Sequence, residues 1–252
     1  MTTIWLRSIM YTLMGLYFLT DFHTHILPGI DDGSRDVEMS ISMLEEETRQ
    51  QVKRIVATPH FYANRTSVED FLARREKSLQ RLRKALGDSG SQIITGAEVY
   101  YFPGMGKAEK LKELCIEGTN VILLEMPFAQ WTADIYREVK DILQKQELNI
   151  VLAHVERYPE FQKDKQVWEQ ILRLPLTIQI NGGSFLKGWS RKRMCMKLLQ
   201  EQKNAIIGSD CHNMTSRRPN IAEARETIAK KLGNRRLELI DETVERVLSQ
   251  GK

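Results

Sequence analysis

Two histidines separated by one residue, His23 and His25, are the first residues whose type and spacing could do chemistry. They follow the apolar run Tyr17-Phe18-Leu19, which is typical of a strand. Residues i and i+2 of a strand point to the same face, so both imidazoles would aim in one direction. Two neutral imidazoles can bind one metal ion without backbone strain. Alone the spacing is a weak signal, because a hydrogen-bonded or exposed pair is equally compatible with it.

The rest of the chain strengthens the metal interpretation. All 5 histidines lie at, or within two residues of, the carboxyl end of a predicted strand, and three carboxylates do the same. Together these residues are His23, His25, His60, Glu98, Glu125, His154, Asp210 and His212. The carboxyl ends of parallel barrel strands meet at one mouth, where sites are built. Because a buried carboxylate needs a partner cation, this placement favours a metal centre.

The types of ligand restrict the metal and the reaction. Imidazoles and carboxylates without cysteine favour Mn²⁺, Fe²⁺ or Zn²⁺ over a structural thiolate zinc site. The candidates outnumber the ligands of one ion, so they could hold two or three ions with bridging carboxylates. Clustered ions that activate water and bind oxygens suit the hydrolysis of phosphate esters.

Two arginines are placed to supply positive charge for a phosphate. Arg157 lies three residues after His154, and Arg218 lies six residues after His212, both in predicted loops at the mouth. A guanidinium can make bidentate contact with phosphoryl oxygens. The alternative is that each is an ordinary surface arginine.

Strand and helix patterns alternate along the chain. After the strand that leads to His25, strands are predicted at 54–58, 92–95, 121–124, 149–153, 177–180 and 205–207. Helices are predicted at 34–51 with Ser34 as N-cap, 68–86, 107–115, 133–146, 165–174, 190–202, 221–232 and 237–248. The strands are rich in Ile and Val and apolar on both faces, as helix-covered parallel strands are. The pattern predicts an α/β fold, either barrel-like or doubly wound.

Length and composition set further limits. The 252 residues fit one domain, predicted at 17–252, preceded by an N-terminal extension at 1–16. A net charge of +4 does not indicate a nucleic-acid-binding protein. The apolar stretch from Ile9 to Leu19 is too short to span a bilayer, so no membrane insertion is expected. The 3 cysteines form no C-x-x-C pair, which favours a reducing, cytoplasmic location.

Six motifs carry a resemblance to a known family: DFHTHILPGIDDGS, ATPH, GAEVYY, LLEMP, AHVERY and GSDCHN. In this order they resemble the PHP (polymerase and histidinol phosphatase) superfamily. Within it they are most similar to the bacterial manganese-dependent protein-tyrosine phosphatases of capsule and exopolysaccharide gene clusters, the CpsB/CapC type. The resemblance covers about residues 20 to 232. It implies a single-domain, distorted (β/α)7 TIM-like barrel, the PHP fold, with three metal ions.

The resemblance also implies the ligands of each ion. The first ion would be held by His23, His25, Glu98 and Asp210, and the second by Glu98, Glu125 and His154. The third would be held by Asp32, His60 and His212. The implied metal is Mn²⁺, with Fe²⁺, Zn²⁺, Co²⁺ or Mg²⁺ as alternatives. Arg157 and Arg218 match the family's phosphate-binding arginines, and they and Asp210 are the expected catalytic residues.

The implied function is hydrolysis of phosphotyrosine on a protein by a metal-activated hydroxide. The expected partner is the tail of a tyrosine autokinase that regulates capsular or exopolysaccharide synthesis, and a homo-oligomer is left open. One alternative is a PHP phosphatase that acts on a small phosphate monoester such as histidinol phosphate. Another is a non-enzymatic scaffold module.

A cysteine-dependent alternative lies inside the last motif. Cys211 and Arg217 have the C-x5-R spacing of cysteine-dependent tyrosine phosphatases, in which a thiolate attacks the phosphate. The residues between them include no glycine to let the backbone approach the phosphate. We therefore interpret this spacing as chance.

Overall fold

The computed structural model describes residues 18–87 and 91–251. The extension predicted at residues 1–16, and with it the start of the domain predicted at 17–252, lies outside the described residues. Within the described part of the chain, no helix is long and apolar enough to cross a membrane. Most of the apolar stretch from Ile9 to Leu19 lies outside the described residues.

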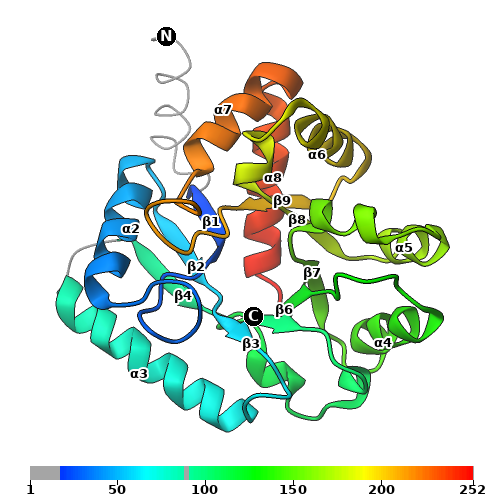
Figure 1. The fold of residues 1–252 in the computed structure, drawn as a ribbon, viewed down its shortest axis with the longest axis horizontal. Helices are drawn as coiled ribbons and strands as arrows, with labels where there is room; N and C mark the ends of the chain where they lie inside the picture. The colour runs from blue at the N-terminus through cyan, green and yellow to red at the C-terminus, as the bar shows by residue number, and fades with distance from the viewer. Residues whose placement is uncertain (1–17, 88–90, 252) are drawn as a thin grey trace.

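The strands form two parallel sheets. The strands are β1 (Thr20–Thr24), β2 (Arg54–Ala57), β3 (His60–Phe61), β4 (Gln92–Thr95), β5 (Glu98–Tyr100), β6 (Val121–Glu125), β7 (Asn149–Leu152), β8 (Thr177–Asn181) and β9 (Ala205–Gly208). A 3-stranded sheet has the order β1-β2-β4, and a 6-stranded sheet has the order β3-β5-β6-β7-β8-β9 (Figure 1). All of these pairings are parallel, which confirms the predicted α/β class.

Two predicted strands are interrupted and then resume. Thr58-Pro59 separates β2 from β3, and Pro59 has no N–H to donate to a ladder. Backbone pairing continues across the gap, because Gly96 N donates to Ala57 O at 2.8 Å and Glu98 N donates to Pro59 O at 3.0 Å. The resumed strands pair His60 with Glu98. The interruption therefore places two polar side chains next to each other at the start of β3 and β5.

The two sheets meet where the segment after β9 lies against β1. Asp210 N donates to His23 O at 2.8 Å, and His25 N donates to Cys211 O at 2.9 Å. The close approach needs glycine at 208, because a Cβ there would lie 2.6 Å from His23 Cβ. Figure 1 shows the loops that follow β1 and β9 side by side.

Helices surround the strands (Figure 1). The α-helices are α2 (Val37–Arg49), α3 (Val68–Leu86), α4 (Ala133–Gln144), α5 (Gln166–Leu172), α6 (Trp189–Glu201), α7 (Ile221–Leu232) and α8 (Asn234–Leu248). The 3₁₀ helices are η1 (Met105–Lys107), η2 (Leu111–Leu114), η3 (Val155–Arg157), η4 (Pro159–Phe161) and η5 (Gly182–Phe185).

Three local predictions are corrected. The N-cap of α2 is Asp36, whose carboxylate accepts from Met39 N at 2.8 Å, whereas the predicted cap, Ser34, donates to Asp36 O. The helix predicted at 107–115 is two short 3₁₀ turns, η1 and η2. The first strand begins at Thr20, after the half-exposed Phe18, so His23 lies inside it.

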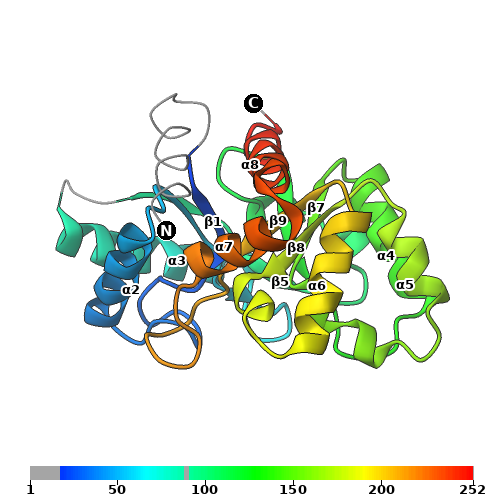
Figure 2. The ribbon, with the colours of Figure 1, turned by 90° about the horizontal axis from the view of Figure 1, so that it is seen from above.

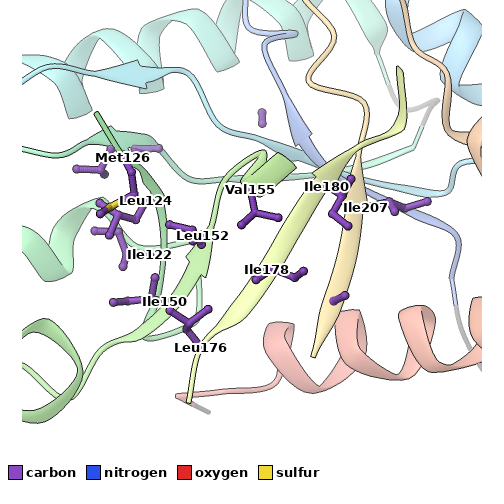
Figure 3. Close-up of a cluster of buried hydrophobic side chains, with 14 of the residues drawn as sticks. Ile122, Leu124, Met126, Ile150, Leu152, Val155, Leu176, Ile178, Ile180 and Ile207 are labelled. Atoms are coloured by element: carbon purple, nitrogen blue, oxygen red, sulfur yellow. The ribbon is translucent and has the colours of Figure 1, made fainter. Parts of the chain in front are cut away.

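The core lies on both sides of the strands. Apolar side chains of β6 to β9 pack with those of α4 and α5, and Figure 3 shows Ile122, Leu152, Ile178 and Ile207 in this cluster. A second cluster joins strand residues to Val247 and its neighbours on α8. Figure 2 shows α8 on the side of the molecule opposite the loops after β1 and β9. The carboxyl ends of the strands are therefore left free for a site.

The contact at Gly208 gives a test of the fold. In Gly208→Ala, the new Cβ would overlap His23 Cβ and lie 2.9 Å from His23 N, so β9 and β1 must separate. We expect the free energy of unfolding, measured by chemical denaturation, to fall by about 1–3 kcal/mol. Gly183→Ala is the control, since its Cβ would meet only Asn220 at 3.4 Å. Equal stability of the two variants would contradict the close packing of β1 and β9.

Candidate metal centre

The H-x-H pair converges on two carboxylates. The Nε2 atoms of His23 and His25 are 3.1 Å apart, as expected for residues i and i+2 of a strand. They lie 3.1 and 3.2 Å from Glu98 Oε2. They also lie 3.6 and 3.4 Å from Asp210 Oδ1. All four side chains are buried, so their ligand atoms enclose one small polar space.

Glu98 also faces a second group. His154 Nε2 lies 2.7 Å from Glu98 Oε1 and 3.5 Å from Glu125 Oε1. His60 Nδ1 lies 3.0 Å from Glu98 Oε2 and 3.7 Å from Glu125 Oε2. The carboxylate of Glu98 thus faces both groups. His60 contacts this group through Nδ1 and a third group, described below, through Nε2.

The third group lies nearest to solvent. His60 Nε2 and His212 Nε2 lie 3.4 and 3.5 Å from Asp32 Oδ1, and the Asp32 side chain is 66% exposed. The ring of His25 lies 3.8 Å from that of His212, centroid to centroid, so His25 borders this group as well as the first. The structure therefore brings all of the sequence-predicted ligands into one continuous cluster at the carboxyl ends of the strands.

Partners on the far side of the rings orient four of the five histidines. Nδ1 of His23 lies 3.1 Å from Gln179 Oε1, and Nδ1 of His25 lies 2.7 Å from Asp31 Oδ2. For His154 the partner is Tyr158 Oη at 3.2 Å, and for His212 it is the carbonyl oxygen of Asp210 at 3.0 Å. An Nδ1–H that donates to these oxygens leaves the Nε2 lone pair facing the cluster, as metal-binding histidines require.

The orienting side chains, such as Gln179 and Asp31, are not predicted from the sequence. Gln179 is a polar residue inside an apolar strand, and its Oε1 also accepts from His154 N at 2.7 Å. Asp31 was visible beside Asp32, but only the structure separates their roles. Asp31 Oδ2 accepts from His60 N at 3.0 Å as well as contacting His25, whereas Asp32 points to the third group.

Several buried polar atoms of the cluster have no hydrogen-bond partner among the described residues. These atoms are His60 Nδ1, Glu98 Oε2, Glu125 Oε2 and His212 Nε2; Asp210 Oδ1 forms no aligned hydrogen bond either, although Arg217 Nη2 lies 2.7 Å from it. Such orphaned groups are costly in a protein interior, and carboxylates are the most costly of them. They converge, and they are oxygens and imidazole nitrogens, so divalent cations fit the space that they enclose.

The pKa values show how strongly the groups compete for positive charge. Burial lowers the pKa of His60 to about 4. Burial and the nearby charge of Glu98 raise the pKa of Glu125 to about 9. Burial opposes the charge on Glu98, but His23 and His60 outweigh it and hold the pKa of Glu98 well below its usual range. Without ions, therefore, protons take the place of metal charge at some of these groups.

The backbone is strained at two of the candidate ligands. His154 has φ of 30° and Asp210 has φ of 54°, in the left-handed region that side-chain-bearing residues rarely adopt. Both residues lie just after a strand, where a sharp turn aims the side chain back over the strand ends. Strain of this kind persists where the surrounding structure enforces it and often marks a functional site.

Of the two arginines predicted to bind phosphate, one lies at the cluster and the other does not. Arg157 Nη1 lies 4.0 Å from Asp210 Oδ2, at the edge of the cluster, as predicted. The structure does not bring Arg218 there: its guanidinium lies 2.6 Å from Glu223 and 4.0 Å from Glu46. Its neighbour Arg217 lies at the edge of the cluster instead, with Nη2 2.7 Å from Asp210 Oδ1. Adjacent loop residues point in different directions, which spacing alone does not predict.

Cys211 is not placed to act as a nucleophile. Its side chain is fully buried, and Sγ lies 3.9 Å from Glu47 Oε1. Burial and the nearby carboxyl groups of Glu47 and Asp21 raise the pKa of the thiol well above its usual value. A reactive cysteine needs partial exposure and a positive environment. The C-x5-R spacing is therefore a coincidence, as the sequence analysis concludes.

Metal binding should release protons at neutral pH. With a pKa near 9, Glu125 holds a proton at pH 7 in the metal-free protein, and an ion must displace it. We expect release of about one proton or more per chain when Mn²⁺ binds, and tighter binding as the pH rises toward 9. Titration calorimetry in buffers of different ionisation enthalpy measures this release. Glu125→Gln should release fewer protons, and no release from the unmodified protein would contradict this account of the centre.

Comparison with known proteins agrees with this geometry. A family model described as capsular polysaccharide synthesis, CpsB/CapC, matches residues 19–248. Tyrosine-protein phosphatase CpsB of Streptococcus agalactiae serotype III is 28% identical over 226 residues, covering 86% of this chain and 93% of the relative. Tyrosine-protein phosphatase YwqE of Bacillus subtilis is 27% identical over 240 residues, covering 91% of each chain.

Solved structures show the same kinship. One, from a study of YwqE from Bacillus subtilis and CpsB from Streptococcus pneumoniae as unique metal-dependent tyrosine phosphatases, matches with a TM-score of 0.77 and 26% identity. The match covers 92% of this chain and 95% of that one. The lactonase Lmo2620 from Listeria monocytogenes, at 13% identity and a TM-score of 0.59, shares the fold alone. Because the family match spans nearly the whole described chain, the protein belongs to the CpsB/CapC family of capsular polysaccharide synthesis.

Proposed function

We propose that this protein is a metal-dependent protein-tyrosine phosphatase. The observation that carries the proposal is the buried cluster of imidazoles and carboxylates, whose unpartnered atoms face one another. The phosphatase names of its relatives support the reaction. The proposed metal is Mn²⁺, with Fe²⁺, Zn²⁺, Co²⁺ and Mg²⁺ as alternatives, and the proposed number of ions is three.

The proposed ligand sets follow the three groups. His23, His25, Glu98 and Asp210 would hold the first ion, Glu98, Glu125 and His154 the second, and Asp32, His60 and His212 the third. The short distances from His60 to Glu98 and Glu125 add His60 as a further contact of the second set. When bound, such ions activate water and neutralise phosphoryl oxygens.

The proposed architecture is a distorted (β/α)7 barrel. Counting β2 with β3 and β4 with β5 as interrupted strands gives the alternation that the sequence predicts. Support comes from the backbone contacts between β1 and the segment after β9, which bring the first and last strands together. Residues 17–252 would form this single domain, with 1–16 as an extension.

The protein's own side chains would bind and orient the phosphate. Arg157 and Arg217 both border the carboxylate of Asp210, and their side chains are 39% and 38% exposed, so a substrate can reach them. Two guanidiniums on one side of the cluster can grip the phosphoryl oxygens in a bidentate way. We therefore assign the second phosphate contact, which the sequence placed on Arg218, to Arg217.

An aromatic substrate fits the surroundings of the cluster. The ring of Phe128 lies 5.9 Å from that of His154, with the Arg157 guanidinium 4.5 Å above it. On another side, Tyr62 lies 5.2 Å from His60, ring to ring. A phosphorylated tyrosine can pack its own ring against such neighbours. Its phenolate leaving group, with a pKa of about 10, needs less protonation than an alkoxide does.

The proposed partner is a phosphotyrosine-bearing tyrosine autokinase of capsular or exopolysaccharide synthesis, met in the cytoplasm. Hydrolysis of histidinol phosphate or another small monoester is the main alternative, and a non-enzymatic scaffold is the other. Phe128 and Tyr62 favour the aryl phosphate. The complete set of ligand side chains argues against a scaffold, which has no use for buried, unpartnered carboxylates.

Metal removal tests the proposed function. We expect EDTA-stripped protein to lose hydrolysis of p-nitrophenyl phosphate and of a phosphotyrosyl peptide, and Mn²⁺ to restore both. Histidinol phosphate should be turned over at least tenfold less efficiently than the peptide. Cys211→Ser, in which a thiol outside the proposed reaction is changed, should keep its activity. Activity that survives EDTA but not Cys211→Ser would overturn the metal mechanism.

The adjacent arginines form a matched pair for a second test. Arg217→Ala should lower kcat/KM for p-nitrophenyl phosphate by about 100- to 1000-fold, the usual loss for a contact to developing negative charge. Arg218→Ala removes a guanidinium that pairs with Glu223 and should change kcat/KM by less than about threefold, since exposed ion pairs contribute little. The opposite ranking would return the phosphate contact to Arg218.

A further inference from the structure

Exposed apolar side chains lie in the segments that follow η3 and β8, two elements that carry residues of the candidate centre. Among the described residues, the exposed large hydrophobic side chains are Phe18, Phe161, Leu186 and Trp189. The last three come from η4, the end of η5 and the start of α6. Trp189 is 75% exposed, and tryptophan is one of the residues enriched at binding interfaces. We call the exposed residues Leu186, Lys187, Trp189 and Arg193, which follow one another closely at the start of α6, the Trp189 surface.

The Trp189 surface is basic. The sequence from Asn181 to Gln200 contains no Asp or Glu, but it carries Lys187, Arg191, Lys192, Arg193 and Lys197. The Arg193 guanidinium lies 5.2 Å from the centroid of the Trp189 ring. Two of these side chains contact an acidic group: Arg191 Nη2 lies 3.9 Å from Glu160, and Lys197 Nζ lies 3.5 Å from Glu201. Positive charge around exposed apolar groups fits an anionic partner that also carries apolar side chains.

The segment that carries this surface starts at the centre. Another exposed apolar residue, Phe161, also lies near the centre, because the ring centroid of Phe128 is 5.9 Å from that of His154 and 5.7 Å from that of Phe161. Asn181, which donates to Asp210 Oδ2 at 2.7 Å, ends β8 five residues before Leu186. In Figure 2 the start of α6 lies on the same side of the molecule as the loops after β1 and β9.

The length of the chain limits how far the surface lies from the reacting phosphate. Trp189 lies eight positions after Asn181, so their Cα atoms are at most about 29 Å apart. An extended peptide covers that distance with about nine residues. A polypeptide whose phosphotyrosine occupies the centre can therefore reach Trp189 with the residues that flank the phosphotyrosine.

We propose that the Trp189 surface binds an acidic segment of the same polypeptide that presents phosphotyrosine to the centre. This inference rests on the proposed function and adds to it a basis for choosing substrates. The acidic side chains pair with Lys187 and Arg193, and an apolar side chain packs on Trp189. A small aryl phosphate has no such segment, so it uses the centre alone.

The test compares substrates on three proteins. The substrates are p-nitrophenyl phosphate and two 21-residue peptides with phosphotyrosine at the centre, one flanked by Glu and Leu and the other by Lys and Leu. The variants are Trp189→Ala and the double variant Lys187→Glu, Arg193→Glu, all at exposed positions. The charge-matched control is Lys77→Glu, Lys84→Glu on the exposed face of α3, which Figures 1 and 2 place away from α6.

The unmodified protein should prefer the acidic peptide. In Trp189→Ala, kcat/KM for that peptide should fall by about tenfold, while kcat/KM for p-nitrophenyl phosphate stays within twofold. The double variant should prefer the lysine peptide, and the α3 control should behave as the unmodified protein does. Equal turnover of both peptides by the unmodified protein, or an equal loss on all substrates in Trp189→Ala, overturns the proposal.

Binding separates this proposal from the proposed function. The affinity of the same peptides for EDTA-stripped protein, measured by fluorescence anisotropy, should show the same acidic preference and the same effect of each variant. Binding without hydrolysis in Mn²⁺ contradicts the phosphatase proposal alone, and absence of the preference contradicts the docking proposal alone. A dimer that Trp189→Ala dissociates, or vesicles of anionic phospholipid that bind through Trp189 while the peptides do not, also overturns the docking proposal.

Discussion

The burial of Glu98 and Asp210 is the constraint on which the rest of the centre depends. Both carboxylates are almost completely shielded from water at the carboxyl ends of the strands. Within the described residues, Glu98 Oε2 has no hydrogen-bond partner, and Asp210 Oδ1 has only the guanidinium of Arg217 close to it. An isolated carboxylate in such a place costs several kcal/mol and normally becomes protonated. Here the surrounding histidines instead hold the pKa values of Glu98 and Asp210 well below their usual range. Divalent cations can supply the positive charge that protonated histidines supply in the metal-free protein.

The fold holds these groups together through backbone features rather than through the helices alone. The breaks in the strands at Thr58-Pro59 and Gly96-Ala97 set His60 beside Glu98 in register. Gly208 allows the segment that carries Asp210 to lie directly on His23. Side chains such as Gln179 then fix the rings, so that the site requires little rearrangement to bind ions.

The sequence predicted the class of fold and the membership of the cluster well, for physical reasons. Because residues i and i+2 of a strand point to the same face, the spacing of His23 and His25 predicts that they converge. Parallel strands bring the polar residues at their carboxyl ends to one mouth. Asp32 was predicted as a ligand only from the family resemblance, because it lies in the loop after β1 and not at the end of a strand. Local propensity could not decide between Ser34 and Asp36 as the cap of α2, because both side chains can accept from a helix N–H.

The sequence could not predict the directions of loop side chains or the residues that orient the candidate ligands. Arg217 and Arg218 have the same charge and nearly the same spacing, and only the path of the backbone decides which one faces Asp210. Asp31 and Asp32 are likewise neighbours with different roles. Exposure of Trp189 also depends on where α6 begins. These features follow from three-dimensional packing, which no periodicity encodes.

The most direct test of the central claim is a crystal structure of the Mn²⁺-loaded protein with anomalous difference maps measured at the manganese edge. Our account predicts three separate peaks: one among His23, His25, Glu98 and Asp210, one between Glu98, Glu125 and His154, and one among Asp32, His60 and His212. A map without peaks in the cluster, with carboxylates and imidazoles paired only to one another, would contradict it.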